Sequence, residues 1–418
     1  MNLQSWVELL WNAAASPEII QLHIRDTVAA FLAGSRTNDG RALMQLHRDG
    51  TKEPAVAAIA RLSECDDIHL ASCITPGSAV IPVALAFAKD NPELQRAISA
   101  GYAAGMGLGR AIGGVKALAH GVWPTLLAAP LMAAVTASLL RGHDRERFAY
   151  AVALALAGAN GRIGRPQGNP SERWFYFADA VARGMRAAEA AGQGLCGDLS
   201  LVSEEWLASQ AGHDDTDMGA LESAPSIVQV GFKPFPIARQ GANAVVAFQR
   251  LLSRGLDPRR IDRVEVSVPG VNTALLKRPI AAEDRLSRIA NVGYQLACAA
   301  LAPERLYDAE RAGPHETLME FAERVSVITA NDLESAMPHR WPARVTAVAG
   351  SDRFEETIID APFDWDASNL PALLREKWQK LLNPEDAALI AGASSSYSEL
   401  WQVLERRVTM ASNEKLEG

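Results

Sequence analysis

The sequence predicts a mainly α protein with a second, smaller α+β domain. Apolar and Ala-rich segments of helical length follow one another from Ser5 to about Ala191, without the alternating pattern of a strand. Alternating polar and apolar residues appear only beyond Pro225, and the helical pattern returns after Leu370. The expected parts are a large helical bundle over residues 1–225, a smaller antiparallel-sheet domain over 226–369, and a tail over 370–418 that completes the bundle.

Helices of the first domain are predicted where apolar residues recur and where Gly or Pro stands at the ends. These segments are Ile19–Ala33, Pro54–Ser63, Ser78–Lys89, Leu94–Ile112, Thr125–Leu140, Arg145–Ala157 and Arg173–Ala191.

The second domain is expected to alternate strands with helices. Arg263–Val268 alternates and stops at Pro269, and Gly350-Ser351-Asp352 between two alternating runs indicates a hairpin. Further elements are expected at Val325–Thr329 as a strand and at Gly241–Ser253, Ala290–Leu301, Glu316–Glu323, Leu370–Leu382, Pro384–Ala393 and Tyr397–Glu405 as helices.

The composition of the chain argues against some classes of protein function. The chain has 418 residues, 48% of them hydrophobic, and a net charge of −8 without blocks of like charge, which argues against a nucleic-acid or membrane partner. Its four cysteines form no CxxC pair, and no signal peptide is recognisable, so we expect reduced thiols and a cytoplasmic protein. An acidic protein that binds an anion must concentrate Lys and Arg locally.

The uncharged stretch Val122–Leu140 is long enough to span a membrane. It contains Pro124 and Pro130 and stands alone, so a buried central helix is the preferred interpretation.

Two segments of the first half carry candidate chemistry. Glu64-Cys65-Asp66-Asp67-Ile68-His69 reads either as an acid/base cluster or as a solvated helix end, and it lacks the ligand spacing of a metal site. The turn that begins at Thr75 precedes a helix. The N-terminus of this helix can bind the carboxylate of a ligand, or the turn can simply provide the N-cap of the helix. Gly105–Arg110 lacks the strand that a dinucleotide motif requires, which favours close helix packing.

Further candidates are isolated polar side chains. Lys233 lies among aromatics and prolines in Gly231–Pro236, where it could bind a substrate carboxylate, act as a base with a lowered pKa, or be a surface lysine of a linker. Arg239 follows closely. Arg173 begins a helix against the dipole, which hints at anion binding. Tyr294, at another helix start, is a proton-transfer candidate or a buried structural tyrosine.

These segments, in this order, resemble the MmgE/PrpD family, whose members include 2-methylcitrate dehydratase, cis-aconitate decarboxylase and iminodisuccinate epimerase. The resemblance covers about Ile19 to Leu301. It rests on several short runs together: Asp66–His69, Pro76–Pro82, Gly101-Tyr102, Gly121–Thr125, the helix Ala178–Ala188, Lys233–Pro236 and Tyr294–Ala297.

The resemblance implies a homodimer, no cofactor or metal, and an active site between the two domains that takes a small carboxylic acid. The family's acidic residue before the Asp-Asp pair falls on Glu64, its lysine on Lys233 and its tyrosine on Tyr294. Three positions depart from the family: Thr75 and Trp123 stand where it has histidines, and Arg173 where it has a lysine. His69 and His120 lie close in sequence to the lost histidines and are candidate replacements.

Chemistry next to a carboxylate needs a base, cations and donors for the developing charge. We assign substrate binding to Lys233, Arg173, Thr75, Arg239 and Trp123, proton transfer to Tyr294 and His69, and their orientation to Glu64 or Asp66. The expected function is a lyase of the dehydratase or decarboxylase type. An epimerase that uses the same α-proton abstraction and a non-catalytic carboxylate-binding protein remain alternatives.

Overall fold

The computed structural model describes residues 3–14, 17–88, 91–162, 171–281, 284–311, 313, 315–359, 362–363, 368–392 and 396–411. The described chain forms two compact units. The first comprises Met1–Arg165, Ser171–Gly231 and Leu382–Gly418, and the second contains Phe232–Leu381. The helix α17 (Leu370–Leu381) therefore belongs to the second unit, whereas the sequence had assigned it to the tail. Each unit is described by itself.

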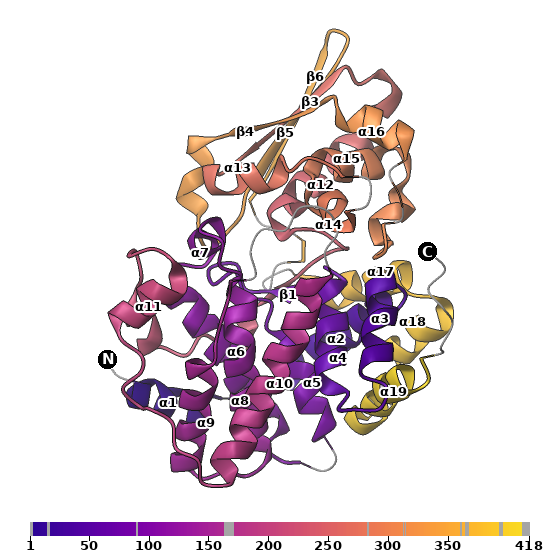
Figure 1. Ribbon diagram of the computed structural model, residues 1–418. Helices are drawn as coiled ribbons and strands as arrows, with labels where there is room; N and C mark the ends of the chain where they lie inside the picture. Colours follow the sequence, from indigo (N-terminus) through magenta and orange to yellow (C-terminus); the bar gives the residue numbers. More distant parts are fainter. Residues whose placement is uncertain are drawn as a thin grey trace. The chain divides into compact units, whose positions relative to one another are not determined.

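The first unit is helical, as expected, and the mainly α fold class with a smaller α+β part is confirmed (Figure 1). Its N-terminal helices are α1 (Leu3–Trp11), α2 (Pro17–Gly34), α3 (Asn38–Leu46), α4 (Glu53–Leu62), α5 (Gly77–Ala86), α6 (Leu94–Ala111) and α7 (Val115–Ala119). The later elements are α8 (Pro124–Leu140), α9 (Arg145–Ala157), α10 (Glu172–Gly192), α11 (Glu204–Ala211), the 3-10 helices η1 (Met218–Glu222) and η2 (Ile227–Gln229), and the short strand β1 (Asp67–Ile68).

The apolar stretch that raised the question of a membrane is the central helix of this unit. Every residue of α8 is buried, and the helix packs against α5, α6, α9 and α10. Surrounding helices thus cover an apolar surface that runs all the way around it. None of the described helices combines the length and the apolar character needed to cross a bilayer.

Glycines allow the neighbours of α8 to approach closely. A Cβ atom on Gly101 or Gly105 of α6 would lie 2.3 Å from Thr136 Oγ1 or from Met132 Sδ, both on α8. A Cβ on Gly184 of α10 would lie 2.2 Å from the carbonyl oxygen of Pro130. The glycine-rich run of α6 is therefore a helix-packing surface, as its lack of a preceding strand predicted.

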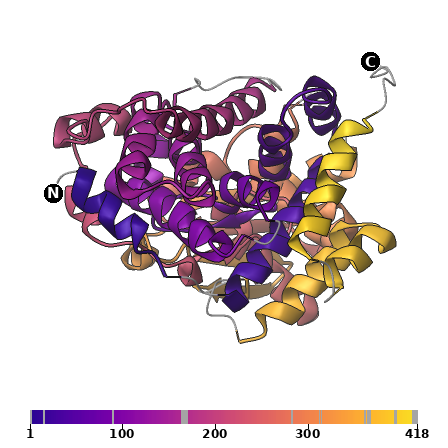
Figure 2. The ribbon, with the colours of Figure 1, turned by 90° about the horizontal axis from the view of Figure 1, so that it is seen from below.

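Two C-terminal helices complete the first unit. The helices α18 (Pro384–Ala391) and α19 (Tyr397–Thr409) contact α2, α3, α4 and α5, and they lie in yellow beside the indigo N-terminal helices in Figure 2. Buried Asp386 accepts from Arg36 at 2.8 Å and from Arg407 at 3.1 Å, which ties the tail to the loop before α3.

The second unit is built on a four-stranded sheet in the order β4-β3-β5-β6. The strand β3 (Arg263–Val268) pairs parallel with β4 (Val325–Thr329) and antiparallel with β5 (Ala343–Ala349). The hairpin partner β6 (Asp352–Ile358) runs antiparallel to β5, and Gly350 in the turn has a φ of +61°, which glycine adopts without strain. The short strand β2 (Gly231–Phe232) stands at the boundary between the units.

Helices cover one face of this sheet. The helix α12 (Arg239–Ser253) contacts β5, β6 and α15 (Val292–Leu301), and α15 contacts α16 (Glu316–Ala322) (Figure 1). A single apolar core that includes Val266, Phe248 and Leu296 fills the space between helices and sheet. The remaining elements are α13 (Gly270–Leu276), α14 (Arg285–Ala290), η3 (Pro258–Arg260), η4 (Pro303–Tyr307) and η5 (Asn331–Ala336).

Candidate functional site

Asp67 joins three helices of the first unit at a buried point. Its Oδ2 accepts from the Tyr102 hydroxyl of α6 at 2.6 Å and lies 2.9 Å from His23 Nδ1 of α2. Its Oδ1 accepts from the backbone N–H of Gly77, the first residue of α5, at 2.9 Å. Burial, and then the Asp67 charge, raise the pKa of Tyr102 well above its usual value, so the phenol remains a donor. Asp67 thus fixes the turn that holds Thr75.

Arg61, which the sequence analysis did not single out, binds both acidic candidates. Its Nη1 lies 3.0 Å from Glu64 Oε2 and 3.4 Å from Asp66 Oδ1, and all three side chains are buried. Burial alone would lower the pKa of the Arg61 guanidinium, but Asp66 and Glu64 raise it above its ordinary value. Glu64 has a φ of +56°, a strained conformation for a non-glycine residue that turns its side chain back toward α4.

Two guanidinium groups lie on the ring of Trp123, the N-cap residue of α8. Arg173 at the start of α10 lies 4.4 Å from the ring centroid, and Arg61 lies 5.4 Å from it. Trp174 meets the same ring edge-on at 6.0 Å, and Phe177 stacks on it at 5.6 Å. We call these five residues the Trp123 cluster.

The Trp123 cluster combines aromatic rings with two arginines, of which Arg61 is paired with Glu64 and Asp66. Cation–π contacts favour a guanidinium over a tryptophan face, and Arg173 makes a second one with Trp174 at 4.8 Å. A guanidinium stacked in this way presents its N–H donors around its edge, the geometry that binds a carboxylate in bidentate fashion. The indole N–H can donate but cannot take up a proton, so Trp123 cannot replace a histidine as a base.

Thr75 lies at the start of the turn that Asp67 fixes. Both its backbone N–H, at 3.2 Å, and its hydroxyl, at 3.3 Å, donate to Oγ1 of Thr125, two residues after Trp123. This pair connects the turn before α5 to the start of α8.

The two histidine candidates differ in exposure. His69 is buried, and its Nδ1 lies 2.8 Å from the Ser72 hydroxyl. His120 is exposed and donates from Nδ1 to the carbonyl of Lys116 at 2.9 Å, and its ring lies 4.9 Å from that of His213. The burial of His69 suits a proton-transfer group better than the exposed position of His120 does.

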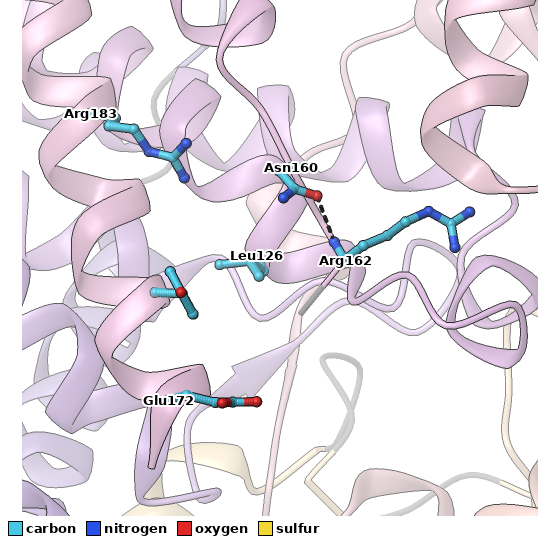
Figure 3. Close-up of a pocket in the computed structure, with 6 residues that line it drawn as sticks. Leu126, Asn160, Arg162, Glu172 and Arg183 are labelled. Carbon is cyan, nitrogen blue, oxygen red and sulfur yellow. Dashed lines mark hydrogen bonds between the residues drawn. The ribbon is translucent and has the colours of Figure 1, made fainter. Parts of the chain in front are cut away.

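A recess of about 330 Å³ lies beside the starts of α8 and α10 (Figure 3). Leu126 and Glu172, next in sequence to Thr125 and Arg173, contribute to its lining. The side chain of Arg162 extends away from the other labelled residues in Figure 3 and donates to the carbonyl of His120 at 3.3 Å. The other lining residues are Asn160, Tyr176 and Arg183.

Charges in this recess are mixed. Arg183 lies 3.2 Å from Asp179 and donates to the carbonyl of Gly158 at 2.9 Å. The exposed Glu172 adds a negative charge. Arg173 of the Trp123 cluster, which lies over two tryptophan rings, is the anion-binding candidate that we consider in this region.

The three remaining predicted residues lie in the second unit. Lys233 and Arg239 are both buried, and Arg239 donates to Asn243 Oδ1 at 3.3 Å, one turn further along α12. The backbone N–H of Tyr294 donates to Asn291 Oδ1 at 2.8 Å, which caps α15 and sets the position of the ring. Burial raises the pKa of Tyr294, which therefore keeps its proton at neutral pH.

The structure brings some of the predicted site residues together within a unit. In the first unit it brings together Arg173 and Trp123, with Glu64 and Asp66 linked to them through Arg61. Arg61 could have been recognised as the one charged residue in the otherwise apolar segment Ala55–Leu62. The contacts of Asp67 have no comparable signal, because they join four separate segments.

No three or more His, Cys, Asp or Glu side chains of the described chain are arranged to hold a metal ion.

By its architecture this is a two-unit protein, with a helical unit and a smaller α+β unit. The Trp123 cluster lies at the N-terminal end of the buried helix α8. Residues 54–219, which contain the whole Trp123 cluster, match the family model of the MmgE/PrpD N-terminal domain. Over these residues the chain is similar to the MmgE/PrpD family. Members of this family are generally enzymes of the dehydratase or lyase type. No curated protein matches the chain.

Proposed function

We propose that the chain is a cofactor-independent lyase that acts next to a carboxylate of a small di- or tricarboxylic acid. The observation that carries this proposal is the Arg173 guanidinium, which lies 4.4 Å over the Trp123 ring within the region that matches the family. A permanent cation on a rigid aromatic face can hold a substrate carboxylate without itself taking part in proton transfer.

The proposed reaction begins with removal of a proton from the carbon next to the carboxylate. In a dehydratase the electron pair left on that carbon forms a double bond, while the hydroxyl of the neighbouring carbon takes up a proton and leaves as water. In a decarboxylase the bond to a carboxylate breaks in place of the C–H bond, CO2 leaves, and a proton is added to the carbon that carried it. We propose Arg173 and, from the resemblance, Lys233 and Arg239 as the cations that bind the acid. Thr75 and Trp123 are proposed to contact the substrate.

Proton transfer is proposed for His69 and Tyr294. The carboxylates Glu64 and Asp66 act through Arg61, whose position they fix against Trp123. We further propose that the protein is a cytoplasmic homodimer, as the resemblance implies, and light scattering would test the dimer.

One observation favours a non-catalytic carboxylate-binding protein as the second candidate. Thr75 and Trp123 stand at the two positions where the family has histidines, and neither side chain titrates near neutral pH. Such a protein would bind the acid and leave its α-proton in place.

Proton exchange on candidate acids tests the proposal and separates it from this alternative. Citrate, methylcitrate, cis-aconitate, itaconate and iminodisuccinate are incubated with the protein in deuterated water and followed by NMR, and binding is measured by thermal shift. We expect one acid to bind, to exchange its α-proton and to form product. Exchange without product would indicate an epimerase, and binding without exchange would indicate the non-catalytic alternative. If none of these acids binds, the proposal is wrong.

The variant Arg173→Met tests the observation itself. It keeps a long side chain over Trp123 but removes the charge, so we expect the acid to bind about tenfold to a hundredfold more weakly. Arg259→Met, at an arginine whose side chain is 89% exposed in the other unit, is the matched control and should leave binding unchanged. Equal affinities for Arg173→Met and the wild type would remove Arg173 from the site.

A further inference from the structure

A buried arginine joins the two candidate segments of the second unit. Arg311 lies in the loop after η4 and is fully buried, in a chain where arginine is otherwise a surface residue at most positions. Its φ of +51° places its backbone in the left-handed region, which costs energy for any residue except glycine. Such a residue persists only where its surroundings require it.

The guanidinium of Arg311 holds the end of the Lys233 turn. Its Nη2 donates to the carbonyl oxygen of Pro236 at 2.8 Å and to that of Leu306 at 3.2 Å. Pro236 closes the turn that starts at Lys233. Because both carbonyl oxygens accept from one planar group, the turn is fixed to η4 through a single side chain.

The same nitrogen also reaches the helix that carries Tyr294. Arg311 Nη2 lies 3.3 Å from Oε1 of Gln295, the residue after Tyr294, and Gln295 Nε2 donates to the carbonyl of Arg288 at 2.9 Å. Arg288 in turn donates from Nε to the carbonyl oxygen of Arg311 at 2.9 Å. These contacts close a ring of hydrogen bonds around the start of α15.

The loop of Arg311 meets the phenol of Tyr294 as well. The Tyr294 hydroxyl donates a weak hydrogen bond of 3.5 Å to the carbonyl of Gly313, two residues after Arg311. Burial raises the pKa of Tyr294 most, the Cys298 thiol raises it further, and the charges of Arg311, Arg288 and Arg305 lower it. The negative charge of Asp308, the residue after η4, also acts on Arg311.

We propose that Arg311 is a positioning residue that fixes the Lys233 turn and Tyr294 relative to each other, so that the side chains of Lys233 and Tyr294 act together. This inference rests on the proposed function for the roles of Lys233 and Tyr294. An apolar residue at position 311 would leave the carbonyls of Pro236 and Leu306 buried without this donor, and a lysine would keep the charge but not the planar group that holds Nη2 against both carbonyls.

The test uses fluorine NMR on the full chain labelled with 3-fluorotyrosine, whose phenol ionises at lower pH than that of tyrosine. The chain has six tyrosines, and the Tyr294→Phe variant assigns the signal of interest. We expect Arg311→Met to displace the Tyr294 signal at neutral pH and to raise its titration midpoint, because a nearby positive charge has been removed. Arg311→Lys should displace the signal as well, but should keep more of the wild-type midpoint.

A second readout follows Lys233. The rate at which Lys233 is acetylated is measured by mass spectrometry, and we expect Arg311→Met to raise it about tenfold, since the turn loses a hydrogen bond from a charged donor. Val266→Ala, in the core strand β3 of the same unit, is the control for simple loss of stability. It should lower the melting temperature and leave both the Tyr294 signal and the Lys233 rate unchanged.

The proposal is overturned if Arg311→Met leaves the Tyr294 signal and the Lys233 rate at their wild-type values, or if Val266→Ala moves them equally. Should Arg311→Met fail to fold, Arg311→Lys decides alone: an undisplaced Tyr294 signal would refute the positioning role. Neither readout depends on turnover. Displacement of both signals in a protein that processes no acid would support the role of Arg311 and reject the proposed function.

Discussion

At the scale of single residues, the candidate site depends on a glycine that no side chain can replace. A Cβ atom on Gly77 would lie 2.7 Å from Asp67 Oδ2 and 2.8 Å from both Thr27 Oγ1 and the Tyr102 hydroxyl. Asp67 and Tyr102 belong to the hydrogen-bonded centre that fixes the turn of Thr75. Since these two side chains are buried and hydrogen-bonded to each other, they cannot move apart cheaply.

We therefore expect Gly77→Ala to lower the free energy of unfolding of the first unit by about 1–3 kcal/mol. The better helix propensity of alanine offsets only part of this loss. Chemical denaturation followed by circular dichroism measures the effect. Gly50→Ala, where a Cβ atom would meet nothing within 4 Å, is the control and should be close to neutral. Equal stability of the two variants would show that the packing around Gly77 adapts.

At the scale of elements, close packing around α8 holds the helical unit together. The glycines of α6 and α10 let both helices approach α8, whose own surface is apolar on every side. The contact at Gly184 is the tightest of these to a backbone atom, because the carbonyl of Pro130 cannot rotate away as a side chain would.

Gly184→Ala should consequently separate α10 from α8 and lower the free energy of unfolding of the first unit by about 3 kcal/mol. The start of α10 carries Arg173, so the binding of an acid should weaken at the same time. Gly158→Ala serves as the control, since its nearest atom would be 4.0 Å away. An undisturbed melting curve for Gly184→Ala would contradict the proposed packing.

The long helices and the hairpin could be predicted from the sequence, because apolar periodicity and turn residues are local signals. The structure places α6 at Leu94–Ala111 and the β5–β6 turn at Gly350, close to the expected positions. The helix α3 was not predicted, since its start, Asn38-Asp39-Gly40, reads as a turn; Thr37 caps it instead.

The candidate site was predictable only in part, because its geometry is not local. The sequence indicates Arg173 through its unusual place at a helix start, but not that it would lie on Trp123. Likewise, the pairing of Glu64 and Asp66 with Arg61 depends on a backbone reversal with positive φ at Glu64, which side-chain patterns do not reveal.

At the scale of the whole molecule, the chain leaves the first unit and returns to it. Residues Leu382–Gly418 belong to the same compact unit as the N-terminal helices, although the second unit separates them in sequence. The helical unit therefore cannot be complete until the last part of the chain has been made. Buried Leu400, Leu404 and Val408 of α19 show that this contact is apolar.

Deletion of residues 382–418 should destabilise the first unit and leave the second largely unchanged. Hydrogen–deuterium exchange with mass spectrometry, resolved by peptide, measures both units in one experiment. We expect faster exchange in α2, α3, α4 and α5, the helices that contact α18 and α19. A deletion of residues 412–418 is the control and should leave the exchange of these helices unaltered. Uniformly faster exchange throughout both units would contradict this division.

The enclosure of α8 also bears on how such a protein can change over evolutionary time. All seventeen residues from Pro124 to Leu140 are buried, so nearly every polar replacement along this helix would be removed by selection for folding. The position just before its first residue is different: the Trp123 side chain contacts charged and aromatic groups of other helices, and only its backbone carbonyl accepts a hydrogen bond from the helix. New chemistry can therefore arise at this one position, by single replacements, while the scaffold inherited by the lineage stays intact.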